Sequence, residues 1–308
     1  MVSEPEHLLV VARIPDDLRA ALSRDHILKE YAQELSLANY RVAVTTSVGG
    51  FPADLMRQLP ALRFIACNGV GLDRIDLDEA RRRGIRVCNT PGVLNEDVAD
   101  LAVALIYAAS RRIVEADRFV RSGRWASERM GLSRRVHGRV AGIVGLGQIG
   151  SAVARRTQAL GLRTVYTGPR RKPEVDLEYF ATVEAVARES DFLILCASTG
   201  ATSRGMVEEK VLKALGPEGF LINVARGELV DEQALLAALE SQAIAGAALD
   251  VFAREPAIDP RFLALDNVVL QPHHASLTGE TRAAMIGILE RGIAEYLRDA
   301  SPSQQENH

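Results

Sequence analysis

An arginine, two carboxylates and a histidine follow successive apolar runs in the second half of the sequence. They are Arg226, Asp250, Glu255 and His273. Each apolar run predicts a buried strand, and parallel strands bring their carboxyl ends to one edge of a sheet. Arginine binds a carboxylate or a carbonyl without losing its proton, whereas histidine gives and takes a proton near neutral pH. Together these residue types suit chemistry on a small molecule that carries both a carboxylate and a carbonyl.

A glycine-rich stretch, VGLGQIG, supplies a second chemical feature. Gly145, Gly147 and Gly150 form the pattern G-x-G-x-x-G directly after a strand-like run and directly before a helix-like segment. The first glycine permits a tight turn, the second lets a pyrophosphate approach the backbone, and the third lets the helix pack on the strand. Helix-start amides would bind the phosphates, with Gln148 and Ile149 among the contacts. The pattern predicts a dinucleotide site, and the alternative is a merely structural turn.

The basic sequence GPRRKP, residues 168–173, lies about twenty residues beyond this turn. A chain that binds NAD carries an acidic residue near this point, where it hydrogen-bonds the ribose. Here Arg170 and Arg171 stand instead, and a planar guanidinium suits the additional 2′-phosphate of NADP. The alternative is a solvated basic turn. The missing acid and the two arginines together favour NADP(H) over NAD(H).

A dinucleotide site and the strand-end residues together fit hydride transfer to a 2-oxo acid. Arg226 would hold the carboxylate and the carbonyl, and His273 would protonate the ketone oxygen. A glutamate near the ring, such as Glu255, favours the imidazolium form. Taken singly, each residue also has a structural explanation: a cation at a helix start, a surface carboxylate, and a histidine with only a structural role.

Elements that would position these residues alternate along the whole chain, because apolar runs are separated by helix-period segments. This pattern is typical of parallel sheets covered by helices, an α/β fold. Strands are predicted at 7–12, 40–46, 63–68, 85–89, 139–145, 163–168, 191–198, 219–225, 244–252 and 267–273. The stretch 95–123 predicts one long helix that would form a spine between two domains, and 278–299 predicts an amphipathic helix.

These motifs resemble the D-isomer-specific 2-hydroxyacid dehydrogenase family over essentially the whole chain. VGLGQIG, NVARGELVDEQAL, GAALDVFAREP and LQPHHAS occur in the family's order and approximate spacing. The resemblance implies catalytic roles for Arg226, Glu255 and His273. The adjacent His274 matches a position that the family does not use for catalysis. The resemblance also implies that Asp250 contacts the nicotinamide amide.

The first half contains CNGVGLDRIDL, which is similar to the substrate loop of the family. The resemblance implies that the backbone amides of Val70 and Gly71 bind the substrate carboxylate, and a turn with free amides is an anion nest. The alternative is a simple strand-to-helix turn. The implied fold has two Rossmann-like or flavodoxin-like parallel-sheet domains with a cleft between them. Residues 1–97 plus 278–308 would bind the substrate, and residues 98–277 would bind the dinucleotide.

Within the family, the chain looks closest to the NADPH-preferring glyoxylate/hydroxypyruvate and hydroxyphenylpyruvate reductases. It departs from them at Pro169, where such members often carry the phosphate-binding arginine, so Arg170 would take that role one residue later. We therefore expect NADPH-dependent reduction of glyoxylate, hydroxypyruvate or a similar 2-oxo acid to the D-2-hydroxy acid. One alternative is a non-enzymatic dinucleotide-sensing protein, like the family's corepressors. A formate dehydrogenase is disfavoured by Glu255, because such members carry a glutamine there.

Composition and charge exclude several other classes. A net charge of −3 gives no basic field for nucleic acid, and no apolar run approaches the ~18 residues of a membrane span. The N-terminal sequence does not read as a signal peptide, and the cysteines lack metal-ligand spacing. We expect a cytoplasmic protein without metal and, from the resemblance, a homodimer. Trp125 and Met130, in the segment 122–133, either line a neighbouring subunit's pocket or belong to a surface loop.

Overall fold

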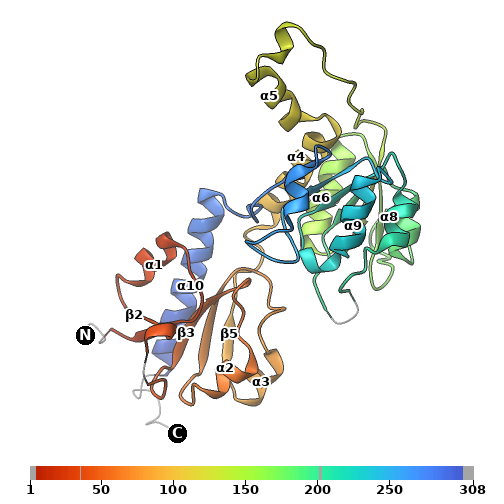
Figure 1. The fold of residues 1–308 in the computed structure, drawn as a ribbon. Coiled ribbons are helices and arrows are strands. Elements are labelled where there is room, and N and C mark those ends of the chain that lie inside the picture. The colour runs from red at the N-terminus through yellow and green to blue at the C-terminus, as the bar shows by residue number, and fades with distance from the viewer. Residues whose placement is uncertain (1–4, 35, 201–202, 301–308) are drawn as a thin grey trace. The chain divides into compact units, whose positions relative to one another are not determined.

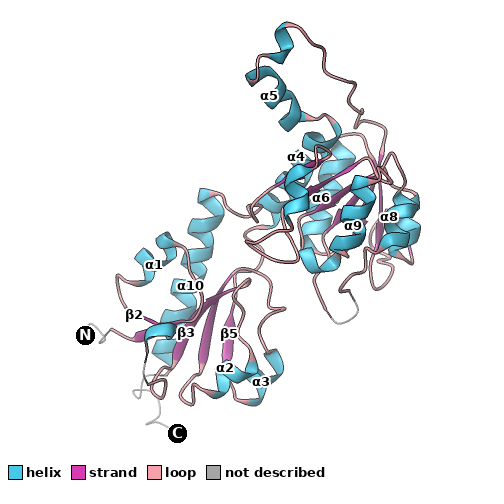
Figure 2. Cartoon of the chain, in the orientation of Figure 1, coloured by secondary structure: helices cyan, strands magenta, loops and turns pink. Residues whose placement is uncertain are grey.

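The chain folds into two compact units in the computed structural model. One unit comprises Met1–Val93 together with Thr278–His308, and the other comprises Leu94–Leu277 (Figure 1). The residues that the structure describes are 5–34, 36–200 and 203–300. Each unit is an α/β domain built on a parallel sheet, as the sequence predicts (Figure 2). The sequence-based division after residue 97 falls in the first turn of helix α4 (Asn95–Ser110), which belongs to the second unit.

The first unit contains a five-stranded parallel sheet with the order β2-β1-β3-β4-β5. This is the flavodoxin-like order, in which the chain reverses direction across the sheet after the first strand. The strands are β1 (His7–Val10), β2 (Ile27–Glu30), β3 (Val42–Thr46), β4 (Phe64–Asn68) and β5 (Arg86–Cys88). The helical segments between them are α1 (Asp16–Leu22), η1 (Tyr31–Gln33), α2 (Ala53–Arg57) and α3 (Leu77–Arg82).

Helix α10 (Gly279–Asp299) brings the end of the chain back to this first sheet. Its Leu289 and Ile293 are fully buried in the cluster that also contains Phe64 of β4. Tyr296 stacks on Phe64 with 5.1 Å between the ring centroids. Burying a large apolar side chain stabilises the fold by ~1.5–3 kcal/mol. The first unit is therefore completed by a segment that follows the whole of the second unit in sequence.

The second unit contains a seven-stranded parallel sheet with the order β12-β11-β10-β9-β6-β7-β8. Counted within the unit, this is the Rossmann order 3-2-1-4-5-6 with one further strand at the end. The strands are β6 (Val140–Val144), β7 (Arg163–Thr167), β8 (Glu178–Phe180), β9 (Phe192–Leu195), β10 (Phe220–Asn223), β11 (Gly246–Leu249) and β12 (Val268–Leu270). The order reverses between β6 and β9, the place where such sheets bind ligands.

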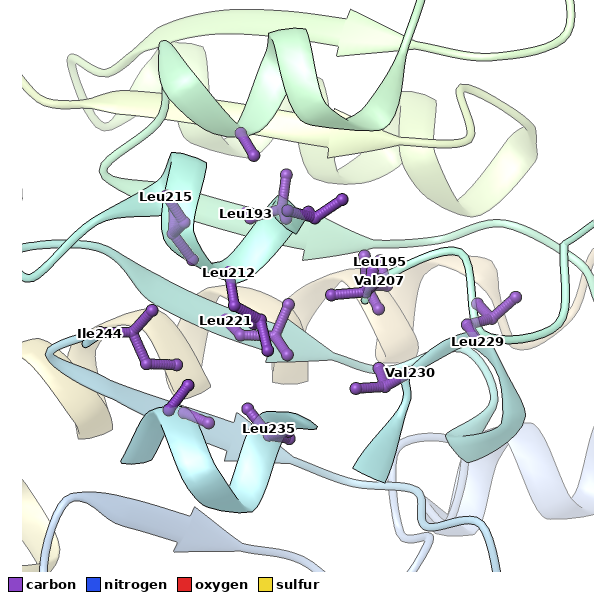
Figure 3. Close-up of a cluster of buried hydrophobic side chains, with 14 of the residues drawn as sticks. Leu193, Leu195, Val207, Leu212, Leu215, Leu221, Leu229, Val230, Leu235 and Ile244 are labelled. Atoms are coloured by element: carbon purple, nitrogen blue, oxygen red, sulfur yellow. The ribbon is translucent and has the colours of Figure 1, made fainter. Parts of the chain in front are cut away.

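Helices and short helical turns connect these strands. They are α6 (Gln148–Ala159), α7 (Val183–Arg188), α8 (Glu209–Leu215), η3 (Gly227–Leu229), α9 (Glu232–Glu240) and η4 (Pro260–Ala264). Figure 3 shows the buried aliphatic cluster beneath α8 and α9. Leu212 and Leu215 of α8 and Leu235 of α9 pack there with Leu193 and Leu221 of the sheet. This core fixes the strands whose carboxyl ends carry the predicted site residues.

The prediction of one long helix over residues 95–123 is wrong. Helix α4 ends at Ser110, and a separate helix, α5 (Ile113–Arg121), follows it. Between them Arg112 adopts a left-handed conformation with φ of 53°, which no α-helix can contain. Helix α4 packs on β10 and β11, whereas α5 leads away from the body of its unit (Figure 1). There is accordingly no single spine helix.

Three features concern thiols, metal ligands and membrane spans in the described part of the chain. All three cysteines are free thiols, and burial raises the pKa of Cys196 to about 12, so its reactive thiolate is disfavoured. No group of His, Cys, Asp or Glu within the described ranges is arranged to hold a metal ion. None of the helices described is long and apolar enough to cross a membrane.

Candidate active site

The glycine-rich turn after β6 combines two close contacts with one open position. Gly145 has φ of 94°, and a Cβ there would lie 2.6 Å from the Cα of Ala197. A Cβ on Gly150 would overlap the carbonyl oxygen of Gly145. By contrast, a Cβ on Gly147 would meet no atom within 4 Å. The protein's own packing therefore requires Gly145 and Gly150, whereas Gly147 faces space that a ligand can occupy.

Helix α6 starts immediately at this turn, and no side chain caps its N-terminus at Gly147. The first N–H groups of an α-helix have no partner inside the helix, and they carry the positive end of its dipole. Gln148 and Ile149 are the first two residues of α6, and the Gln148 side chain accepts a hydrogen bond of 3.1 Å from Asn95 Nδ2. The geometry suits a phosphate group.

The basic turn after β7 is held at both ends by tyrosine hydroxyls. Tyr179 donates a hydrogen bond of 3.2 Å to the carbonyl of Gly168, and the N–H of Lys172 donates one of 2.8 Å to Tyr166. Tyr166 is almost fully buried, and its ring lies 5.3 Å from that of Tyr179. The backbone of the turn is therefore anchored to the sheet.

The three cations of this turn divide into two kinds. Arg170 and Arg171 are exposed, and neither has a hydrogen bond or an ion pair with any described residue. Lys172 is half-buried, and its Nζ donates a hydrogen bond of 2.6 Å to the carbonyl of Leu146, inside the glycine-rich turn. Two guanidinium groups are thus free to bind an anion, and the ammonium group supports the neighbouring turn.

Arg226 follows β10, and a buried asparagine fixes the backbone around it. Asn223 donates from Nδ2 to the carbonyl of Arg226 at 3.0 Å and accepts at Oδ1 from the N–H of Ala225 at 3.1 Å. Gly227 packs so closely that a Cβ there would overlap the backbone of Phe252. Sequence reasoning missed Asn223, although an amide inside the apolar run FLINVA was the signal for it.

His273 and Glu255 form a hydrogen-bonded pair. The Nδ1 atom of His273 lies 2.7 Å from Oε2 of Glu255, and Oε1 of Glu255 accepts a hydrogen bond of 2.9 Å from the N–H of Phe252. The His273 side chain is 32% exposed, and its other nitrogen, Nε2, contacts no hydrogen-bonding partner among the described residues. One ring nitrogen is therefore oriented by a carboxylate, and the other is available for proton transfer.

Asp250 follows β11 and organises the segment that carries the histidine. Its carboxylate accepts hydrogen bonds from the N–H groups of His274, at 2.6 Å, and Ala275, at 3.0 Å. The N–H of His273 donates to the Asp250 carbonyl at 2.8 Å. Asp250 is 1% exposed, and this burial raises the pKa of its carboxyl group. His274, in contrast, is exposed. The structure thus gives Asp250 a positioning contact that sequence reasoning did not foresee.

A second carboxylate that sequence reasoning missed supports the segment after β11. Glu232, in the first turn of α9, accepts a hydrogen bond of 3.1 Å from the N–H of Ala253. Glu255 binds the neighbouring N–H of Phe252. Arg226, Asp250, Glu255 and His273 therefore all lie after the adjacent strands β10, β11 and β12, on segments held by buried or half-buried polar groups.

Val70 and Gly71 lie in the first unit, directly after β4. Within the described chain, neither of their N–H groups donates a hydrogen bond. Asn89 holds the turn by donating from Nδ2 to the carbonyl of Val70 at 2.8 Å. Two free amides in a fixed turn have the character of an anion nest.

Comparison with known proteins points to one family. Residues 103–275 match the family model described as D-isomer specific 2-hydroxyacid dehydrogenase, NAD binding domain. The chain is 44% identical over 303 residues to the 2-ketogluconate reductase of Gluconobacter oxydans, covering 97% of both proteins. It is 44% identical over 261 residues to a glyoxylate/hydroxypyruvate reductase A of Arabidopsis thaliana, covering 85% of this chain and 83% of that protein.

A solved structure has the same fold over nearly the whole chain. The NADPH-dependent glyoxylate/hydroxypyruvate reductase of Sinorhizobium meliloti, in complex with NADP and malonate, is 36% identical and aligns with a TM-score of 0.89. The alignment covers 96% of this chain and 94% of that one.

Proposed function

The chain belongs to the D-isomer specific 2-hydroxyacid dehydrogenase family, and we propose that it reduces a small 2-oxo acid to the D-2-hydroxy acid with NADPH. The observation that carries the proposal is the pair of His273 and Glu255, 2.7 Å apart, in the unit that also holds Arg226 and the glycine-rich turn. Relatives named as glyoxylate, hydroxypyruvate and 2-ketogluconate reductases support this class of substrate.

In the proposed reaction the protein holds the substrate and supplies one proton. Arg226 binds the carboxylate and the carbonyl of the 2-oxo acid, and this interaction polarises the ketone. His273, protonated and oriented by Glu255, gives its Nε2 proton to the ketone oxygen. The free N–H groups of Val70 and Gly71 are proposed to bind the substrate carboxylate as well.

A dinucleotide fits the residues of the second unit. The turn from Gly145 to Gly150 would hold its pyrophosphate, with the N–H groups of Gln148 and Ile149 among the donors. When bound, the dinucleotide supplies the hydride. A contact between Asp250 and the nicotinamide amide stays a prediction, since both Asp250 carboxylate oxygens already accept backbone hydrogen bonds.

Preference for NADPH is proposed from Arg170 and Arg171. Both are exposed, neither has a partner among the described residues, and their turn is anchored by two tyrosines. A guanidinium fork matches the geometry of a phosphate group. An NADP complex of the Sinorhizobium meliloti relative is in keeping with this preference.

The test of the proposed function is oxidation of NADPH and of NADH with glyoxylate, hydroxypyruvate, phenylpyruvate and 2-ketogluconate. Turnover of any of these acids with a strong preference for NADPH is the expected result. Preference for NADH would make the basic turn a solvated loop. Binding of NADPH without any turnover would favour the alternative, a dinucleotide-sensing protein.

The double variant Arg170→Ala/Arg171→Ala tests the selectivity directly. It is expected to raise the KM for NADPH at least tenfold and to leave the KM for NADH nearly unchanged, because only NADPH carries the 2′-phosphate. The matched control is Arg135→Ala, since Arg135 is also exposed and has no partner in the described part of the chain. Equal losses with both dinucleotides would contradict the assignment.

We also propose a homodimer formed through the arm, by which we mean α5 and residues 122–133. Trp125 is 62% exposed and Leu132 is 98% exposed, and exposed apolar patches commonly mark interfaces. Met130 instead lines a cavity of about 950 Å³ within its own unit, beside Phe119 and Val268. Trp125 is therefore the better candidate to reach a neighbouring subunit. The cytoplasmic location stays a prediction.

A further inference from the structure

Lys172 contacts the glycine-rich turn and not its neighbours in the basic turn. Its Nζ donates a hydrogen bond of 2.6 Å to the carbonyl of Leu146, the residue between Gly145 and Gly147. Leu146 is 5% exposed, so this carbonyl belongs to a nearly buried residue. Hydrogen bonds from a charged donor are stronger than those between neutral groups. The contact therefore joins two turns that lie 26 residues apart in the sequence.

The Leu146 carbonyl belongs to the peptide group that carries the N–H of Gly147. This peptide is trans, and in a planar trans peptide the C=O and N–H bonds point in opposite directions. Lys172 holds the oxygen on its side, so the Gly147 N–H is directed to the opposite side. That N–H has no acceptor among the described residues, and Gly147 borders open space. Lys172 thus fixes a free donor beside the start of α6.

Lys172 is itself fixed in place. Its own N–H donates a hydrogen bond of 2.8 Å to the hydroxyl oxygen of Tyr166, whose side chain is buried. This bond anchors the backbone of Lys172 to β7. Arg170 and Arg171 precede it in the same turn and project freely into solvent. Lys172 therefore differs from the two arginines, because its backbone is anchored and its ammonium group is already hydrogen-bonded.

We propose that Lys172 is a positioning residue for the dinucleotide: it orients the Leu146–Gly147 peptide so that the Gly147 N–H donates to the pyrophosphate. This inference rests on the proposed dinucleotide-dependent function. The pyrophosphate is common to NADPH and NADH, so Lys172 contributes equally to the binding of both. Arg170 and Arg171, by contrast, contribute to the 2′-phosphate, which only NADPH carries.

The experiment compares Lys172→Met and Lys172→Arg with the wild type by calorimetric titration of NADPH and of NADH. Lys172→Met is expected to weaken binding of both about tenfold and to leave their ratio unchanged, because one charge-assisted contact is lost. Lys172→Arg keeps a cationic donor and is expected to restore most of the affinity. In steady-state kinetics the loss should appear in the KM for both dinucleotides rather than in kcat.

Other outcomes separate this inference from the proposed selectivity. Loss of NADPH binding alone in Lys172→Met would place Lys172 on the 2′-phosphate and overturn the inference. Unchanged affinity for both dinucleotides, with only a lower melting temperature, would reduce the contact to a structural role and also overturn it. If Lys172→Met weakens both dinucleotides but Arg170→Ala/Arg171→Ala changes neither, the inference stands and the proposed NADPH preference fails.

Discussion

His273 adopts a left-handed backbone conformation, with φ of 55°, that few residues other than glycine tolerate. Such a conformation costs ~1–3 kcal/mol and persists only where the surroundings impose it. Asp250 imposes it here, because its carbonyl accepts from the N–H of His273 and its carboxylate accepts from His274 and Ala275. In this backbone conformation the Nδ1 atom of the His273 ring lies within hydrogen-bond distance of the Glu255 carboxylate.

Replacement of the histidine separates chemistry from binding. His273→Ala is expected to lower kcat by roughly 100- to 10,000-fold, because general acid catalysis contributes that much, and to leave the dissociation constant for NADPH nearly unchanged. The control is His274→Ala, which removes an exposed ring from the next residue and should retain turnover. Equal loss of turnover and NADPH binding in His273→Ala would show that the histidine is structural.

Asn223 offers a second test at this scale. Asn223→Ala removes both side-chain hydrogen bonds that fix the backbone of Ala225 and Arg226, leaving two backbone groups without those partners. We expect the KM for the 2-oxo acid to rise about tenfold and the free energy of unfolding to fall by ~1–3 kcal/mol.

Asn267→Ala is the control for Asn223→Ala, because Asn267 also donates to a backbone carbonyl, that of Leu239. Asn267 directly precedes β12, so it lies at the amino ends of the strands and not at the carboxyl ends that carry the candidate site. It should lower stability without changing the KM for the substrate. A KM for the 2-oxo acid that stays at the wild-type value in Asn223→Ala would contradict the positioning role.

Among the elements, the ten strands that the sequence predicted are all present, because each is a short apolar run. Strands β2 and β8 were missed. Both lie at an edge of their sheets, and the half-exposed sequences ILKE and EYF show neither a continuous apolar run nor a clean alternation. The break between α4 and α5 was also not predicted from the sequence, because Arg111 and Arg112 are good helix formers and no glycine or proline marks the site.

The predicted site residues follow the same logic. Arg226, Glu255 and His273 became candidates because parallel strands bring their carboxyl ends together, a rule that needs only the sequence. Their catalytic roles are predicted from the resemblance to the family. The supporting contacts of Asn223 and Glu232, and the contact between Lys172 and Leu146, depend on the paths of loops. Loop paths are set by side-chain hydrogen bonds that no residue pattern specifies.

The packing of helix α10 on the first sheet predicts how much one of its side chains contributes to stability. Leu289→Ala removes a fully buried side chain from the first unit's core and is expected to lower the free energy of unfolding by ~2–5 kcal/mol, measured by urea denaturation. Leu263→Ala is the control, since Leu263 is 70% exposed and its loss should change stability by less than ~0.5 kcal/mol. Similar values for the two variants would show that α10 contributes little to that core.

At the scale of the whole molecule, the arm carries apolar surface that its own unit does not cover. Leu132→Lys introduces a charge at the most exposed of these side chains and is expected to convert a dimer into a monomer in sedimentation-velocity measurements. Leu263→Lys, at an exposed leucine outside the arm, should leave the dimer intact. A wild-type protein that sediments as a monomer would refute the proposed homodimer.

The return of α10 to the first sheet has a consequence during synthesis on the ribosome. Residues up to Val93 emerge first, but Leu289 and Ile293, which close the face around Phe64, emerge only with the last part of the chain. The second unit, Leu94–Leu277, is contiguous and can fold as soon as its final strand has left the exit tunnel. Ribosome-bound chains arrested soon after that point should therefore resist protease in the later segment and be cleaved in the earlier one. The first unit is therefore expected to become native only after α10 has been synthesised, and the apolar side chains around Phe64 stay uncovered until then.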